Sequence, residues 1–116
     1  MNEREQTVRL WFDMWLQAED RGITSIFAPD CIYTESWGPE YHSAAQVKHW
    51  FEEWNTRGRV LVWDILRFFH AENHTAVEWR FKNQMLDGRV EEFDGFSLIR
   101  WTADGKIASL KEFGCN

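Results

Sequence analysis

A single carboxylate stands among aromatic side chains in the segment CIYTESWGPEYHS, residues 31–43. Glu35 ends an alternating apolar run and is followed by Trp37 and a Gly-Pro pair, so it is expected where a strand gives way to a turn. Burial beside Trp and Tyr rings would raise the pKa of this carboxyl toward neutrality, which is how a carboxylate becomes a proton-transfer base. A solvated carboxylate at a strand end is the alternative, and this segment alone leaves both open.

A second carboxylate, Glu112, lies in the last predicted strand and has the same two interpretations. It shares a strand face with Leu110, because residues two apart point to the same side of a sheet. It either faces a cavity or lies on an exposed final strand. In an earlier strand, charged residues alternate with Trp79 and Phe81, and we expect the charges outside and these two rings inside.

The composition narrows the classes of function. The net charge of −6 argues against nucleic-acid binding, which depends on neutralising phosphates with Lys and Arg. No basic run exceeds two residues and no apolar stretch is long enough to span a bilayer, so we expect no membrane partner. The polar N-terminus predicts a cytoplasmic protein in which Cys31 and Cys115 are reduced. The four histidines lack metal-ligand spacing, so neither a metal site nor a cofactor is predicted.

The elements that must position these residues begin with a helix, predicted from a stripe of apolar residues at helical spacing. An Asn2–Glu5 capping pair precedes the stripe and Gly22 follows it, which are typical start and stop signals. A second, short helical segment stops at Ala28-Pro29, because the residue before a proline avoids the helical region. The stripe consists of Val8, Trp11, Phe12, Trp15 and Leu16.

A third helix is predicted after the segment that carries Glu35. Ser43 and Gln46 form a capping box at its start, and Gly58 is expected to end it. Its apolar face consists of Val47, Trp50, Phe51 and Trp54.

The rest of the chain is predicted to form antiparallel strands, because β-branched and aromatic runs alternate with short turns. In the first run, strict alternation places Val60, Val62 and Asp64 on one face, yet both faces are largely apolar and should be covered. We therefore predict a sheet that curls around the helices and forms a homodimer through its convex face, with Gly95 as the site of a bend or bulge. The runs are residues 59–69, 75–82, 89–101 and 106–113.

The order of these elements resembles the nuclear transport factor 2-like fold, in particular its SnoaL-like and ketosteroid-isomerase-like branches, over essentially the whole chain. The resemblance implies a single α+β domain, residues 1–116, built as a cone-shaped barrel. Three N-terminal helices would pack in the concave face of a strongly curved, mainly antiparallel sheet. Isomerases, cyclases, hydrolases, dehydratases and non-catalytic binders share this fold, so it does not define the activity. The best local matches are Gly22-Ile23 leading to Phe27-Ala28-x-Asp30, then x-Glu35-x-x-Gly38, and Asp104-Gly105-Lys106-Ile107.

The same resemblance implies roles for individual residues. Glu35 stands at the position of the general-base aspartate of ketosteroid isomerases. Their two oxyanion donors, a phenol and a protonated aspartate, fall at Trp11 and Ser97, so the base is kept while both strong donors are replaced. Glu112 corresponds to the final aspartate of the limonene epoxide hydrolase branch, although the Arg-x-Asp pair of that branch has no counterpart here.

We therefore expect an aromatic-lined cavity for a small, mostly apolar molecule, with Glu35, Trp11, Ser97 and Glu112 as catalytic groups. One hypothesis is a cofactor-independent isomerase, cyclase or dehydratase in which Glu35 is the base. The other is a non-catalytic binder of a small apolar ligand or a dimeric interaction module. The predicted ligand-binding residues are Trp15, Tyr33, Trp37, Trp50, Trp54, Val60, Val62, Trp79, Phe81 and Phe93.

Overall fold

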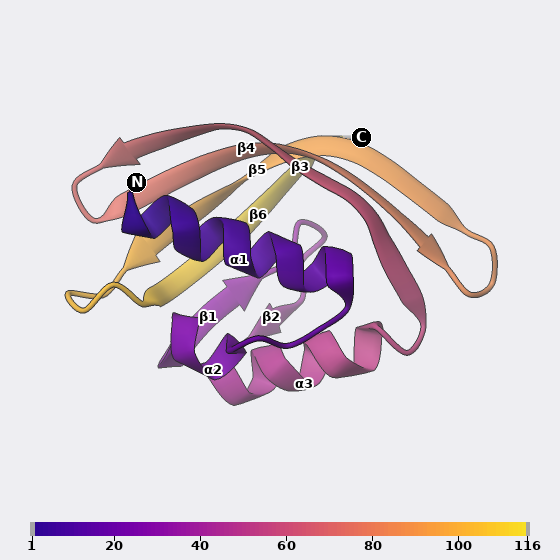
Figure 1. Cartoon of the computed structure of the whole chain (residues 1–116), viewed down its shortest axis with the longest axis horizontal. Coiled ribbons are helices and arrows are strands. Elements are labelled where there is room, and N and C mark those ends of the chain that lie inside the picture. The colour runs from indigo at the N-terminus through magenta and orange to yellow at the C-terminus, as the bar shows by residue number, and fades with distance from the viewer. Residues whose placement is uncertain (1, 116) are drawn as a thin grey trace.

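Three helices and a six-stranded mixed sheet make up the computed structural model, which describes residues 2–115 (Figure 1). The predicted α+β class is confirmed, while the cone shape of the sheet stays a prediction. No helix within the described residues is long and apolar enough to cross a membrane. The helices are α1 (Glu3–Gln17), α2 (Ile23–Ile26) and α3 (Ala44–Trp54). The strands are β1 (Phe27–Thr34), β2 (Glu40–Tyr41), β3 (Gly58–Ala71), β4 (His74–Met85), β5 (Val90–Trp101) and β6 (Ile107–Cys115).

The sheet has the strand order β2-β1-β6-β5-β4-β3. β1 and β6 run parallel, and every other pair of neighbours is antiparallel. The four C-terminal strands form the predicted antiparallel meander, which is confirmed. The parallel pairing of β1 with β6 joins the first strand of the chain to the last, and it brings the end of β1 next to the second half of β6.

The start of α1 was predicted correctly and its end was not. The Asn2 side chain accepts hydrogen bonds from the backbone N–H groups of Arg4 and Glu5, at 2.8 and 3.3 Å. The helix ends at Gln17, where Ala18 adopts the left-handed conformation with φ 54°. Gly22, the predicted stop, is instead the N-terminal cap of α2, at φ 119°.

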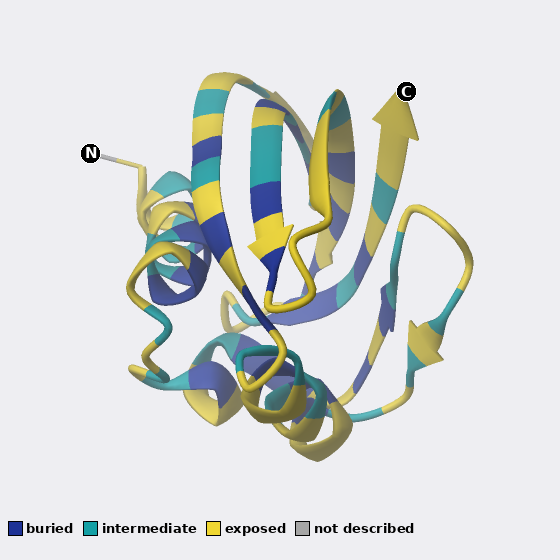
Figure 2. Ribbon diagram, turned by 90° about the vertical axis from the view of Figure 1, so that its right-hand side faces the viewer, coloured by how far each residue is buried: buried dark blue, intermediate teal, exposed yellow. Residues whose placement is uncertain are grey.

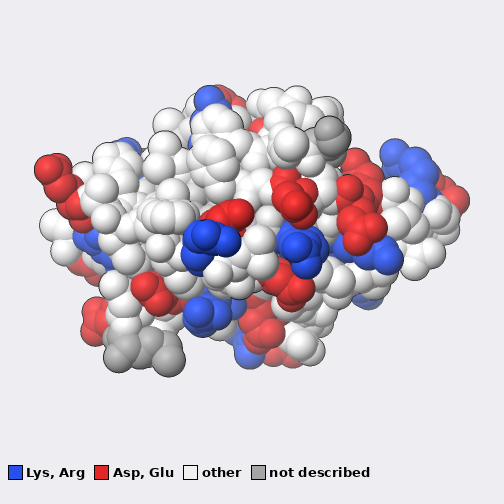
Figure 3. Space-filling model, turned by 90° about the horizontal axis from the view of Figure 1, so that it is seen from above, with Lys and Arg blue, Asp and Glu red and all other residues white. Residues whose placement is uncertain are grey.

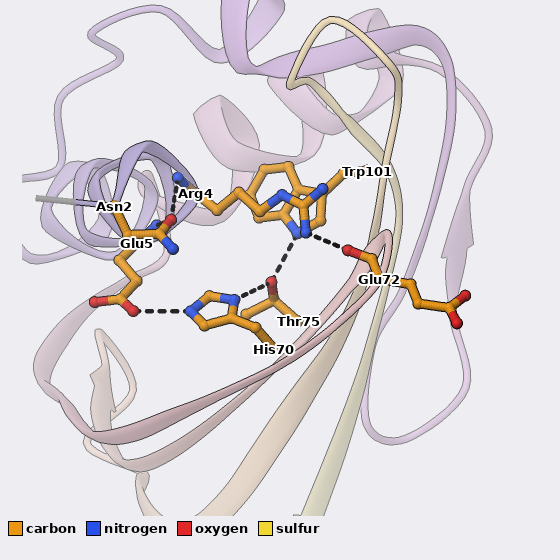
Figure 4. A network of polar contacts seen from close by, with 7 residues as sticks. All are labelled: Asn2, Arg4, Glu5, His70, Glu72, Thr75 and Trp101. Atoms are coloured by element: carbon orange, nitrogen blue, oxygen red, sulfur yellow. Dashed lines mark hydrogen bonds and ion pairs between the residues drawn. The ribbon is translucent and has the colours of Figure 1, made fainter.

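Side chains also fasten the start of α1 to the β3–β4 hairpin (Figure 4). The Glu5 carboxylate lies 2.8 Å from Nε2 of His70, whose Nδ1 lies 2.9 Å from the Thr75 hydroxyl. The Trp101 indole N–H donates to the same hydroxyl at 2.8 Å. The Arg4 guanidinium donates to the Glu72 carbonyl at 2.7 Å. These contacts hold the N-terminal end of α1 against the sheet.

β1 begins at Phe27, so the prediction that the short helical segment continues to Ala28-Pro29 is wrong. The reason is the parallel partner β6, whose Ile107 lies in register with Phe27. Pro29 is tolerated because the pairing with β6 is interrupted between Phe27 and Ile32, where no proline N–H is needed.

The predicted capping box of α3 is confirmed, since Ser43 Oγ accepts a hydrogen bond from the Gln46 N–H at 3.0 Å. The helix ends at Trp54, so Gly58 does not close it. Gly58 instead opens β3, where a Cβ would lie 2.6 Å from Sδ of Met85 in the paired strand β4. A Cβ there would also lie 3.1 Å from the Gln84 carbonyl, so this glycine allows close contact between the strands and is not a helix stop.

Two β-bulges in β3 overturn the strict alternation predicted for this strand. The register with β4 shifts between Val60 and Val62 and again between Ile65 and Arg67. As a result Val60 and Trp63 are both buried while Asp64 is exposed. Gly95, the predicted bulge, pairs in register on both sides. A Cβ at Gly95 would lie 2.7 Å from the Trp79 ring, so close packing accounts for this glycine.

The core is an extensive cluster of aromatic rings between α1, α3 and the sheet. Trp11 of α1 packs edge-on against Phe27 of β1, with ring centroids 4.9 Å apart. One residue on, Phe12 stacks on Trp63 of β3 at 3.8 Å. α1 therefore contacts strands near opposite ends of the sheet order. Figure 2 shows buried and exposed bands alternating along the strands, as expected for a sheet with one face in the core.

Candidate functional site

A cavity of about 1040 Å³ lies between α3, the turn after β1 and the inner face of β3 to β6. Both carboxylates singled out in the sequence, Glu35 and Glu112, are among its lining residues. Nine of its lining residues are aromatic, and the rings come from α1, α3 and five segments of the sheet and its turns. The aromatic lining residues are Trp15, Trp37, Tyr41, Trp50, Trp54, Trp63, Trp79, Phe81 and Phe93.

Glu35 lies in the tight turn between β1 and β2. The turn is closed by two backbone hydrogen bonds, from the Gly38 N–H to the Glu35 carbonyl at 3.0 Å and from the Glu35 N–H to the Pro39 carbonyl at 2.9 Å. The Tyr41 hydroxyl donates to the Glu35 carboxylate at 2.6 Å, and the Trp37 indole N–H lies 3.4 Å from its other oxygen. The side chain is therefore held in one orientation.

Burial is the largest influence on Glu35 and raises the pKa of its carboxyl. The hydrogen bonds from Tyr41 and Trp37 oppose this, because they stabilise the charged form. Burial also raises the pKa of the Tyr41 phenol, which therefore keeps its proton and remains a donor.

Glu112 lies on β6 and accepts a hydrogen bond from the hydroxyl of Tyr33 on the parallel neighbour β1. Burial raises the pKa of Glu112 to about 8, with a smaller contribution from the charge of Glu35. Tyr33 is fully buried, and burial together with Glu112 raises its pKa well above the usual range. At neutral pH the cavity therefore holds one carboxyl that is mostly protonated, Glu112, backed by a neutral phenol.

Trp11 and Ser97, expected as oxyanion donors, do not line the cavity. Trp11 is fully buried in the core, and its indole N–H has no hydrogen-bond partner among residues 2–115. The Ser97 hydroxyl accepts a hydrogen bond from the Trp79 indole N–H at 3.0 Å. Ser97 thus lies behind the wall of the cavity, where it holds a lining ring in place.

Most of the residues predicted to bind ligand do line the cavity, with two exceptions. Tyr33 lies behind Glu112, and Val62 is absent because the bulge before it brings Trp63 to the inner face instead. The predicted residues that line it are Trp15, Trp37, Trp50, Trp54, Val60, Trp79, Phe81 and Phe93.

Sequence reasoning missed Tyr41, Trp63 and Asn83. Tyr41 stacks on Trp50 with centroids 4.6 Å apart and holds Glu35 at the same time. A signal for it was present, since Tyr41 follows Glu35 across a turn short enough to pair the flanking strands. Trp63 was hidden by the bulge, and no local pattern marks Asn83 as a buried residue of the wall.

No group of three or more His, Cys, Asp or Glu side chains that could hold a metal ion occurs between residues 2 and 115. The lining includes two carboxyl groups in different environments, Glu35 and Glu112. Burial raises the pKa of both carboxyls, and carboxyls with raised pKa values in a cavity are typical of acid–base sites.

Comparison by sequence identifies one family. The model of the SnoaL-like domain matches residues 8–110. A comparison with curated proteins gave no match.

Solved structures with the same fold cover nearly the whole chain. A protein with a ketosteroid isomerase-like fold from Catenulispora acidiphila, solved in complex with trimethylamine, is 18% identical, with a TM-score of 0.77, over 92% of this chain and 83% of that one. An NTF2-like protein of unknown function from Burkholderia pseudomallei is 18% identical, with a TM-score of 0.79, over 99% and 92%. A steroid delta-isomerase from Pseudomonas aeruginosa is 16% identical, with a TM-score of 0.72, over 100% and 82%. At these identities the likeness shows the fold alone.

Proposed function

The chain belongs to the SnoaL-like domain family, and we propose that it binds a small, mostly apolar molecule in the aromatic-lined cavity and uses Glu35 as a proton-transfer base. The reaction class is a cofactor-independent isomerisation, cyclisation or dehydration. The observation that carries this proposal is the pair of carboxyl groups, Glu35 and Glu112, which line one cavity, have raised pKa values and are each bonded to a tyrosine.

In this proposal the two carboxyls have different roles. Glu35, oriented by Tyr41, removes a proton from a carbon or hydroxyl of the ligand. Glu112 in its protonated form donates a hydrogen bond, or its proton, to the ligand oxygen on which negative charge develops. Tyr33 positions Glu112 from behind. Glu112, positioned by Tyr33, thus takes the role of the oxyanion donor that the sequence had assigned to Trp11 and Ser97.

Two proteins with this fold support a small-molecule role. The Catenulispora acidiphila protein was solved with trimethylamine, and the Pseudomonas aeruginosa protein is a steroid delta-isomerase. Both use the fold seen here, so a ligand in this cavity and proton-transfer chemistry are consistent with them.

The second candidate function is non-catalytic binding, and the positions of Trp11 and Ser97 favour it. The two positions that resemble the donors of the isomerases are both outside the lining of the cavity. A protein that only binds its ligand does not need them, and Glu35 would then serve to recognise a polar group of the ligand.

We further propose that the chain forms a homodimer through the sheet face that is turned away from α1. Figure 3 views this side and shows uncharged surface between scattered charged side chains. Phe69, Phe96, Leu98 and Phe113 are exposed there, and the rings of Phe96 and Phe113 stack at 4.8 Å. Exposed aromatic residues of this kind are typical of interfaces. Light scattering of the purified protein should give the mass of a dimer, and Phe96→Glu should give a monomer.

The proposed activity is tested by identifying the small molecule that co-purifies with the protein, using native mass spectrometry, and then measuring its conversion. Glu35→Gln should still bind the molecule but convert it about 10²–10⁴-fold more slowly, which is the usual range for loss of a general base. Glu40→Gln, an exposed neighbour in β2, is the matched control and should retain activity. Binding without conversion by the wild type would support the second function, and the absence of any binding would exclude both.

A further inference from the structure

Among the described residues, the cavity lining has more unpaired carboxyl groups than unpaired basic groups. Both guanidinium groups in the lining are already paired: Arg57 bonds the Glu53 carboxylate through two nitrogens, at 2.8 and 2.9 Å, and Arg89 bonds Asp87 at 2.9 Å. The remaining basic lining residue, His49, is exposed beside the same Glu53. The two guanidinium groups of the lining are thus paired with carboxylates of the protein.

Three carboxyl groups of the lining have no ion-pair partner within residues 2–115, namely Glu35, Glu91 and Glu112. Their hydrogen-bond donors are all neutral: phenols and an indole for Glu35 and Glu112, and the Asn83 amide at 3.2 Å for Glu91. Arg57 is near enough to lower the pKa of Glu35, but burial outweighs it. Because Glu112 is mostly protonated at neutral pH, the negative charge without an ion-pair partner among these three residues comes from Glu35 and Glu91.

Asn83 adds an independent observation. Its side chain is nine-tenths buried or more and lines the cavity, and while its NH₂ group bonds Glu91, its Oδ1 accepts no hydrogen bond from the described residues. A buried acceptor without a donor costs free energy, and a donor on a bound ligand would relieve that cost.

The aromatic walls determine which kind of cation fits. Trp, Tyr and Phe faces attract cations electrostatically, and the recognition of alkylated ammonium groups by aromatic rings is a common use of this attraction. An inorganic ion would need several oxygen ligands in one cluster, and no such cluster occurs among residues 2–115. We infer that the ligand of this cavity is a small organic cation, an alkylated ammonium compound whose charge is balanced by Glu35 and Glu91 and whose alkyl groups contact the aromatic walls. This inference rests on the proposed function, because it defines the ligand class of the same cavity.

The test compares two molecules of the same shape that differ in charge, choline and its uncharged analogue 3,3-dimethylbutan-1-ol. Binding is followed by the change in tryptophan fluorescence and by calorimetry, at constant ionic strength. Choline should bind at least about tenfold more tightly, which corresponds to about 1.4 kcal/mol and lies within the range of cation–π attraction. Glu91→Gln should weaken choline binding several-fold and leave the analogue unchanged.

The matched control is Glu92→Gln, which removes the same charge from the next residue of β5. Glu92 does not line the cavity and pairs in register with Lys82. Equal affinity for the two molecules, or equal loss of choline binding in both variants, would overturn the inference while leaving a small-molecule site intact. Failure of both molecules to bind would overturn the inference, while the proposed function would still be tested by the molecule that co-purifies with the protein.

Discussion

Replacing Glu112 by Gln should stabilise the folded protein at pH 8 and above. The carboxyl of Glu112 has a pKa of about 8 in the folded chain, against an ordinary value of 4.5. Because the folded state holds this proton more tightly, the free energy of unfolding of the wild type falls as pH rises from 4.5 to 8 and is level above that. Glutamine keeps the shape and the acceptor for the Tyr33 hydroxyl but has no charge to bury.

The size of the effect follows from the shift in pKa. One pKa unit corresponds to about 1.4 kcal/mol, so a carboxyl raised from 4.5 to about 8 carries an upper bound of about 5 kcal/mol at alkaline pH. Denatured-state structure and relaxation around the carboxylate reduce this figure, and we expect a gain of about 2–4 kcal/mol for Glu112→Gln at pH 8.5. At pH 4.5 the two proteins should differ little.

The assay is urea unfolding followed by tryptophan fluorescence at each pH from 4.5 to 9. The curve of stability against pH for Glu112→Gln should be flatter than that of the wild type between pH 5 and 8. Glu92→Gln is the control for removing a charge outside the cavity, and its curve should run parallel to that of the wild type. If the curve of Glu112→Gln also runs parallel to the wild type, the carboxyl is hydrated in the folded state and its assignment as the protonated group fails.

Two further substitutions test the surroundings of the carboxyls and the packing of the sheet. Tyr41→Phe keeps the ring that stacks on Trp50 but removes the hydrogen-bond donor to Glu35, so the pKa of Glu35 should rise further. Carbon NMR of the Glu35 side chain measures this pKa. An unchanged pKa would show that this hydrogen bond is absent in solution. Gly95→Ala places a methyl group against the Trp79 ring and the backbone carbonyl of the paired strand β6, and should lower the free energy of unfolding by about 1–3 kcal/mol in urea titrations. Full stability of Gly95→Ala would contradict the close packing.

Local signals in the sequence predicted the elements because the contacts that define them are local. The side chains of Asn2 and Ser43 reach backbone groups two or three residues away, and both helix starts were found from them. The glycines were less informative. Gly22 and Gly58 follow helical patterns, as helix-ending glycines do, but Gly22 caps the start of α2 and Gly58 allows close contact between two strands.

The residues that line the cavity depend on strand pairings between distant parts of the chain. Local patterns in a single sequence do not show these pairings. The two bulges in β3 appear only against β4, and they decide that Trp63 and not Val62 reaches the inner face. The bond between Tyr33 and Glu112 depends on the parallel pairing of β1 and β6. Glu35 could be located because its neighbours are close in sequence, whereas its relation to Glu112 required the sheet.

The two carboxyls are also where local and global requirements conflict. An aromatic cavity is a poor environment for Glu35 and Glu112, and the protein holds them there with tyrosine hydroxyls that are neutral and so cannot balance their charge. Apolar side chains or glutamines at these two positions would make the folded protein more stable. The gain in free energy of unfolding expected for Glu112→Gln is an example. Positions at which a protein keeps a residue that lowers its stability are typical of functional sites. A cationic ligand would offset the same deficit, so its binding should lower the pKa of Glu112 and stabilise the wild type more than Glu112→Gln.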